Sequence, residues 1–160
     1  MENTSTPTAV AGLLSTVTLS KFKYFAGMSE ETNAFTATVH VAGEAIGTAE
    51  NRGHGGCTFV RFNNQAHALA PFASQIADAV DKLVDAKVNE QHDAKFILKM
   101  RRKARETTAY ITSDCSRGQY IAFKKGVMVN LNAVTAKPGF LKFVSDMTDA
   151  EILSHFTANA

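Results

Sequence analysis

Tryptophan is absent from this chain of 160 residues, and cysteine and proline are scarce, with two and three copies. Two cysteines, Cys57 and Cys115, are too few for a disulfide framework, so a reduced, cytosolic environment is the simpler expectation. The first twenty residues carry no basic segment, and Gly12 and Ser15 interrupt their apolar run. Neither a signal peptide nor a membrane span is therefore expected there.

A strong excess of charge is also missing. The formal net charge is +2, which is too small to argue for a nucleic-acid partner by itself. The contents of 45% hydrophobic and 20% charged residues are typical of a soluble globular protein. The length fits one domain that buries about two-thirds of its unfolded surface. We expect a disordered leader over residues 1–8, where Asn, Thr, Ser and Pro bury little surface, and one domain over residues 9–160.

The N-terminal part of the chain alternates apolar and polar side chains, as half-buried strands do. Strands are predicted over residues 17–25, 35–41, 44–50 and 57–62. The hydrophobic phase slips within the first of these strands, which indicates a bulge. Ala42-Gly43 predicts a hairpin turn between the second and third strands. In the fourth strand either Phe59 or Val60 faces the core. Together these segments predict an antiparallel β-meander.

Two central helices are predicted after the meander. Asn63-Asn64 supply a cap for the first, whose apolar residues recur every three or four positions up to about Asn89. Pro71 marks its first turns, a kink or a later start. The second helix, residues 93–106, is basic. The polar segment 89–93 either separates the two helices or marks exposed turns of one.

The C-terminal part alternates again and then ends in a helix. Further β-like runs are residues 107–112, 119–124 and 127–131. Thr148 and Glu151 match the reciprocal capping pattern that starts a helix. The predicted fold class is α+β: an antiparallel meander, two central helices, further β-strands and a short C-terminal helix. A doubly wound sheet is not expected, because most connections are too short for parallel crossovers.

The segment Asn51–Cys57, NRGHGGC, is the one place where backbone freedom and reactive side chains coincide. Its glycines allow backbone N–H groups to converge on an anion, with a guanidinium beside them. The candidate binding residues in this loop are Arg52, Gly53, His54, Gly55 and Gly56. An imidazole can act as acid or base near neutral pH, and a stabilised Cys57 thiolate as nucleophile. A plain strand-connecting loop is the competing interpretation, since no Lys-Ser/Thr pair and no helix follow the glycines.

The predicted basic helix concentrates positive charge in a short segment. Six of the 17 basic residues lie in it: Lys95, Lys99, Arg101, Arg102, Lys103 and Arg105. With Arg117, Lys124 and Lys125 they are candidates for one continuous patch that contacts phosphates or an acidic protein surface. The alternative is a solvated helix face that pairs with nearby acidic residues, the usual role of such clusters.

Other chemical signatures are weak. Among the histidines, only His54 lies at zinc-ligand spacing from another ligand type, Cys57, and two further ligands would be needed. The cluster of residues 113–116, SDCS, lacks a glycine-flanked nucleophile elbow and is typical of a hydrogen-bonded turn. The sequence therefore predicts no catalytic residue, no metal site and no cofactor.

One segment resembles a pattern in small uncharacterised proteins of bacteriophages and mobile elements. The pattern is an E-T-x-A/C-F-x-A strand, a G-x-x-x-G-T hairpin and an N-x-G-x-G-G loop. The corresponding residues are Glu31, Thr32, Ala34, Phe35, Ala37, Gly43, Gly47, Thr48, Asn51, Gly53, Gly55 and Gly56. The resemblance covers about a fifth of the chain and implies no established activity. It implies a phage-type accessory protein in the cytoplasm of a bacterial host; such proteins often bind host factors, including defence machinery.

We therefore expect a binding protein rather than an enzyme. The expected partner is a host protein or a nucleic-acid complex, engaged through the basic helix, in a counter-defence or host-takeover role. One alternative is a small-ligand or nucleotide site, or an enzyme, built on Arg52, His54 and Cys57. Another alternative is a structural or assembly subunit. The sequence leaves the oligomeric state and the partner's identity open.

Overall fold

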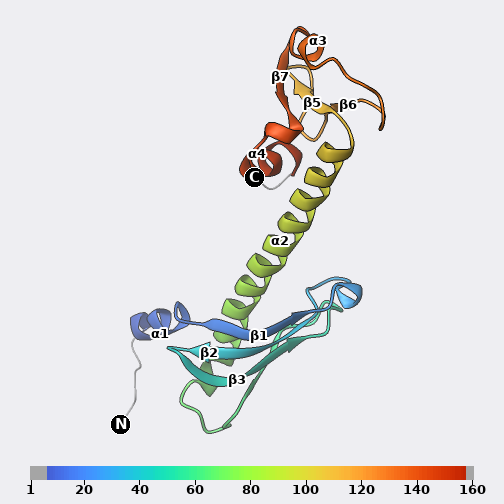
Figure 1. Ribbon diagram of the computed structural model, residues 1–160. Helices are drawn as coiled ribbons and strands as arrows, with labels where there is room; N and C mark the ends of the chain where they lie inside the picture. The colour runs from blue at the N-terminus through green and yellow to red at the C-terminus, as the bar shows by residue number, and fades with distance from the viewer. Residues whose placement is uncertain (1–6, 158–160) are drawn as a thin grey trace. The chain divides into compact units, whose positions relative to one another are not determined.

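The computed structural model describes residues 7–157, and Figure 1 labels most of their helices and strands. The chain divides into two compact units, Met1–Asn89 and Glu90–Ala160, called unit 1 and unit 2 below. Helix α2, Ala73–Glu106, begins in unit 1 and ends in unit 2. The element types and the antiparallel pairing confirm the α+β class. Whether residues 9–160 unfold as one domain is a question of cooperativity, and that expectation stays a prediction.

Unit 1 contains the predicted meander as a four-stranded antiparallel sheet in the order β1-β2-β3-β4. The strands are β1 (Thr18–Tyr24), β2 (Phe35–Val41), β3 (Glu44–Asn51) and β4 (Phe59–Phe62). Ala42 and Gly43 form the predicted hairpin turn with φ of 51° and 83°, which matches the twist of the flanking strands. Of the two β4 residues expected to face the core, Val60 is the one that packs on it, whereas Phe59 faces outward.

The predicted bulge lies in β1. Its pairing with β2 shifts register between Ser20 and Lys23, and Lys21 has a φ of 49°. The extra residue restores the inward direction of the side chains that follow it. Leu19 before the bulge and Phe22 after it consequently both pack on the unit 1 core.

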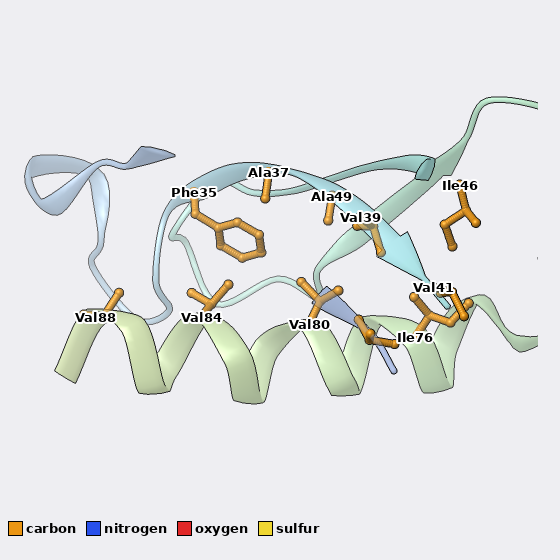
Figure 2. Packing of buried hydrophobic residues seen from close by; sticks show 11 residues of the cluster. Phe35, Ala37, Val39, Val41, Ile46, Ala49, Ile76, Val80, Val84 and Val88 are labelled. Carbon is orange, nitrogen blue, oxygen red and sulfur yellow. The ribbon is translucent and has the colours of Figure 1, made fainter. Parts of the chain in front are cut away.

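The N-terminal half of α2 covers one face of this sheet. Apolar side chains of β2 and β3 point at apolar side chains of α2, as Figure 2 shows. The α2 residues in this layer recur every four positions: Ile76, Val80, Val84 and Val88. That spacing places them on one stripe of the helix, and burying the stripe holds the sheet and the helix together.

The two central helices are one, because α2 is continuous for 34 residues, so the second alternative for residues 89–93, exposed turns of one helix, is the one observed. Residues 89–93 contain neither proline nor glycine, and polar side chains on exposed turns do not interrupt a helix. Helix α2 also begins later than expected from the predicted cap at Asn63-Asn64. Pro71 lies in a 3₁₀ turn, Ala70–Phe72, directly before α2, so the later-start alternative for this proline is the one observed.

Unit 2 contains a three-stranded antiparallel sheet in the order β6-β5-β7. Its strands are β5 (Ala109–Thr112), β6 (Ile121–Ala122) and β7 (Phe140–Phe143). The C-terminal half of α2, strand β5 and helix α4 (Asp149–Phe156) share a core that includes Met100, Ile111 and Ile152. All four residues of β5 are buried, because the strand is central in its sheet.

The predicted strand over residues 127–131 does not form. Both edges of β5 are occupied, by β6 and by the unpredicted strand β7, so no edge of β5 is left for this segment. Instead, Asn130 caps helix α3, Leu131–Thr135, by accepting a hydrogen bond from Ala133 N at 3.3 Å. The alternation of residues 127–131 was therefore not sufficient for a strand, since this segment pairs with no strand of the sheet.

The capping pattern predicted for the last helix is confirmed. Thr148 Oγ1 accepts from Glu151 N, and Glu151 Oε2 accepts from Thr148 N at 2.6 Å. Lys142 of β7 donates to both carboxylate oxygens of Glu151, at 2.8 and 2.9 Å. The hydrogen bond from Lys142, followed by those from Thr148, lowers the pKa of Glu151 to about 2.

This carboxylate makes a testable contribution to acid stability. Its folded pKa lies below its ordinary value of 4.5, so the stabilisation is present above about pH 4.5 and is lost as the pH falls toward 2. Thermal unfolding of Glu151→Gln, which keeps an acceptor but no charge, should give a lower midpoint than wild type at pH 7. The difference should shrink between pH 4.5 and 2. A difference that stays constant over this range would contradict the assignment.

Residues before β1 form a helix that the sequence did not predict. Helix α1, Pro7–Leu14, begins with proline, whose fixed φ and missing N–H suit the first helical turn. The last two residues of the predicted leader thus belong to α1, and residues 1–6 lie outside the described part of the chain. Among residues 7–157, no helix has both the length and the apolarity needed to cross a bilayer.

Candidate functional site

Asn51, the last residue of β3, fixes the glycine-rich loop at both ends. Its Oδ1 accepts from Gly53 N and from Thr32 Oγ1, each at 2.9 Å. Its Nδ2 donates to Gly56 O at 3.0 Å and to Thr58 Oγ1 at 3.2 Å. One side-chain amide therefore uses both its donor and its acceptor ends to set the shape of the loop.

Gly53 ties this loop to the segment that precedes β2. Its carbonyl oxygen accepts from the N–H groups of Glu30, Glu31 and Thr32, at 3.0, 2.9 and 3.3 Å. Its φ is +87°, and a Cβ at this position would lie 2.0 Å from Met28 O. A glycine is thus required here by backbone conformation and by close approach, which is a structural role.

Two carboxylates lie beside the loop. His54 Nδ1 lies 3.1 Å from Glu30 Oε2, and both side chains are largely exposed. A Cβ added to Gly55 would lie 2.1 Å from Glu31 Oε2. Because negative charge already occupies this side of the loop, it is a poor place for a second anion.

A concavity also adjoins the loop. A solvent-open concavity of about 490 Å³ lies at the junction of β3, the loop and β4. The side chains that line it include Glu50, Arg52, His54, Cys57, Phe59 and Arg61. It therefore brings together the predicted loop residues Arg52, His54 and Cys57, and adds Phe59 and Arg61, which sequence reasoning missed. The available signal was the two-residue spacing of Phe59 and Arg61, which places both on one face of a strand.

The predicted basic segment is the last part of α2, in unit 2. Phe96, Ile97 and Met100 on one side of the helix pack on the unit 2 core. Lys95, Lys99 and Arg102 follow one another at intervals of four and three residues, are exposed, and lie opposite the packed side. We call these three residues the basic stripe. Within residues 7–157 none of them has an acidic partner within 4.0 Å.

Two other basic residues of α2 have internal partners. Arg101 donates through Nε and Nη2 to Asp149 Oδ1, at 3.2 and 2.7 Å, and through Nη1 to Ser145 O at 3.3 Å. Lys103 Nζ lies 4.7 Å from the centre of the Tyr120 ring, a cation–π distance. These side chains attach α2 to the rest of unit 2, so they contribute less to any external surface.

Arg105 has a different setting, at the C-terminal end of α2. It and Lys124 line one cavity of about 420 Å³, together with Glu106 and Asp146. Acidic residues therefore share this cavity with the two cations. Arg105 also lies in the last helical turn, where a cation offsets the negative end of the helix dipole.

The remaining candidates have ordinary structural settings. No group of three His, Cys, Asp or Glu within the described residues is placed to hold a metal ion. Cys57 and Cys115 are free thiols, and Cys115 Sγ lies 3.4 Å from Thr112 Oγ1. Thr58 donates a hydrogen bond to Asp81, whose pKa is raised chiefly by burial and further by Asp85 and Asp78.

Comparisons with protein-family models, with curated proteins and with solved structures found no match to this chain.

Proposed function

We propose that this protein is a binding module whose basic stripe contacts the phosphates of a nucleic acid. The carrying observation is that Lys95, Lys99 and Arg102 are exposed along one side of a helix and, among the described residues, form no ion pair. At about 1.5 Å per residue the stripe extends over roughly 10 Å of helix axis. A DNA strand carries one charge per about 3.4 Å of duplex axis, so three cations face a comparable length of backbone.

A rigid helix suits this role. The stripe lies opposite a side that Phe96 and Met100 anchor in the core, so the Cα atoms of the three basic residues keep their spacing without a partner. The helix backbone therefore need not be ordered on binding, and counterion release supplies affinity against the cost of ordering the three long side chains. An acidic protein surface offers fewer evenly spaced charges than a phosphate backbone, which is why nucleic acid is the favoured partner.

The resemblance of the Glu31–Gly56 segment raised the expectation of a host protein or nucleoprotein complex as partner. That expectation, with the counter-defence role, stays a prediction. The nucleic-acid proposal agrees with it but rests only on the placement of charge in unit 2.

The test is a salt series with the triple variant Lys95→Gln, Lys99→Gln, Arg102→Gln. Binding of wild type to duplex and single-stranded DNA and RNA is measured by anisotropy between 50 and 300 mM salt. Three phosphate contacts predict a log–log slope of about −2 to −3. The variant should bind at least about tenfold more weakly at low salt, with a flatter slope. Arg101 is left unchanged because it holds Asp149.

A matched control removes the same charge elsewhere. Lys21→Gln, Lys82→Gln, Lys87→Gln lowers the net charge by the same amount in unit 1 and should leave affinity and slope close to wild type. Equal losses in the two triple variants would show a general charge effect. That result, or a flat salt response of the wild type, would overturn the proposal. Binding restricted to an acidic protein would also overturn it.

A further inference from the structure

The outer face of β4 carries an aromatic side chain where a meander ordinarily places polar ones. Phe59 is 65% exposed, while Thr58 before it is buried and Val60 after it packs on the core. Its ring therefore lies on the sheet face opposite α2, within the concavity at the β3–β4 junction.

Charged groups flank this ring in a regular pattern. Glu50 of β3 is the direct cross-strand partner of Phe59. Arg52 and Arg61 each lie two residues further along the chain; because β3 and β4 are antiparallel, they lie on opposite sides of the Glu50–Phe59 pair, and both line the concavity. Among residues 7–157, the side chains of Arg52, Arg61 and Glu50 form no ion pair. One aromatic plane, one carboxylate and two guanidiniums thus remain available to a ligand.

We propose that this concavity binds an unpaired nucleotide, with the base stacked on Phe59 and its backbone phosphates held by Arg52 on one side of the ring and by Arg61 on the other. A base offers a π-face to the ring, and guanidiniums bind phosphate oxygens in bidentate geometry. The Glu50 carboxylate is an acceptor for the amino groups of cytosine, adenine or guanine. A simple inorganic anion would leave the ring unused and would meet the charge of Glu50, so it is a poorer match.

The surrounding structure prepares the site. Asn51 fixes the loop that carries Arg52 through four hydrogen bonds, and the β3–β4 ladder fixes Glu50 opposite Phe59. The site lies in unit 1 and shares no residue with the basic stripe in unit 2. The inference therefore does not depend on the proposed function, and either can fail alone.

Cys57 provides a direct readout of occupancy. Its thiol is exposed and lines the concavity, whereas Cys115 is half-buried in unit 2. Alkylation of each cysteine by iodoacetamide is followed by peptide mass spectrometry, with and without AMP, CMP, GMP or UMP. Nucleotide should slow the alkylation of Cys57 and leave that of Cys115 unchanged. The same titrations by calorimetry give the affinity.

Variants test which side chains contact the base and which contact the phosphate. Phe59→Ala should weaken nucleotide binding by about tenfold, and Phe59→Trp should retain it, since any aromatic plane stacks. Arg52→Gln with Arg61→Gln should weaken binding of the nucleotide but not of the nucleoside. The matched control Lys21→Gln with Lys82→Gln should have no effect. All variants are compared in the background of the neutralised stripe, so that binding at α2 does not contribute.

The length of the ligand distinguishes a free nucleotide from an unpaired nucleotide within a strand. Single-stranded octamers that bind at least tenfold more tightly than mononucleotides identify an unpaired residue within a strand; the reverse order identifies a free nucleotide. Either result supports the site. Cys57 alkylation that no nucleotide or octamer slows, or unchanged affinity in a folded Phe59→Ala variant, would overturn it. Protection by inorganic phosphate equal to that by nucleotides would also overturn it.

Discussion

Gly53→Ala should destabilise the protein by about 3 kcal/mol or more, because the change combines an unfavourable backbone conformation with a collision. The residue has a φ of +87°, and the new Cβ would lie 2.0 Å from Met28 O and 3.0 Å from Ala34 Cβ. Neither neighbour is the flexible end of a long side chain. The loop must therefore move away and give up the hydrogen bonds that the Gly53 carbonyl accepts from residues 30–32. Urea denaturation followed by circular dichroism measures the loss.

Gly43→Ala is the matched control for this change. Gly43 has a φ of +83°, but a Cβ there would meet no atom within 4 Å. This variant should lose only the conformational cost of a left-handed alanine, about 1–2 kcal/mol. The difference between the two variants isolates the collision. Equal losses would show that a Cβ at Gly53 does not collide with Met28. The close packing of the loop against residue 28, which holds the loop beside the concavity, would then be contradicted.

Phe35→Ala should cost about 3–5 kcal/mol, the range for removing a fully buried aromatic side chain. Phe35 is 1% exposed at the start of β2, and its ring points at the α2 side of the core (Figure 2). The Phe22 ring lies 6.2 Å from it, so the cavity would also remove an aromatic contact. The loss is measured by the same denaturation assay.

Phe59→Ala supplies the comparison for the core variant. It removes the same side chain from the same sheet, but from a position that is 65% exposed. Its stability should stay within about 0.5 kcal/mol of wild type, as for most surface substitutions. A small loss for Phe35→Ala, or a large loss for Phe59→Ala, would contradict the assignment of the two faces. The folded Phe59→Ala protein is also the variant that the nucleotide site requires.

The α+β class and the meander could be predicted because they rest on local chemistry. A two-residue period fixes which side of a strand is apolar, and Gly43 allows the positive φ of a tight turn. The change of phase in the apolar–polar alternation of β1 predicted a bulge, and the Thr148–Glu151 capping box predicted the start of α4. Each of these signals lies within a few residues of the structure it specifies.

The candidate sites were predicted only in part, because charge and exposure depend on distant partners. The basic residues of α2 were found as a group, but their division into an exposed stripe and internally paired side chains depends on Asp149 and Tyr120, far along the chain. The loop residues Arg52, His54 and Cys57 were found, while Phe59 and Arg61 become relevant only through the concavity that the folded strands create.

The sequence by itself therefore determined the alternation of β1 to β4, their turn and bulge, and the cap of α4, since backbone preferences and side-chain periods act locally. Tertiary structure decided that α2 is one helix, that residues 127–131 form no strand, and which face of β4 meets the core. The physical reason is that pairing and burial require a partner surface. A short segment contains no information about whether that surface is free.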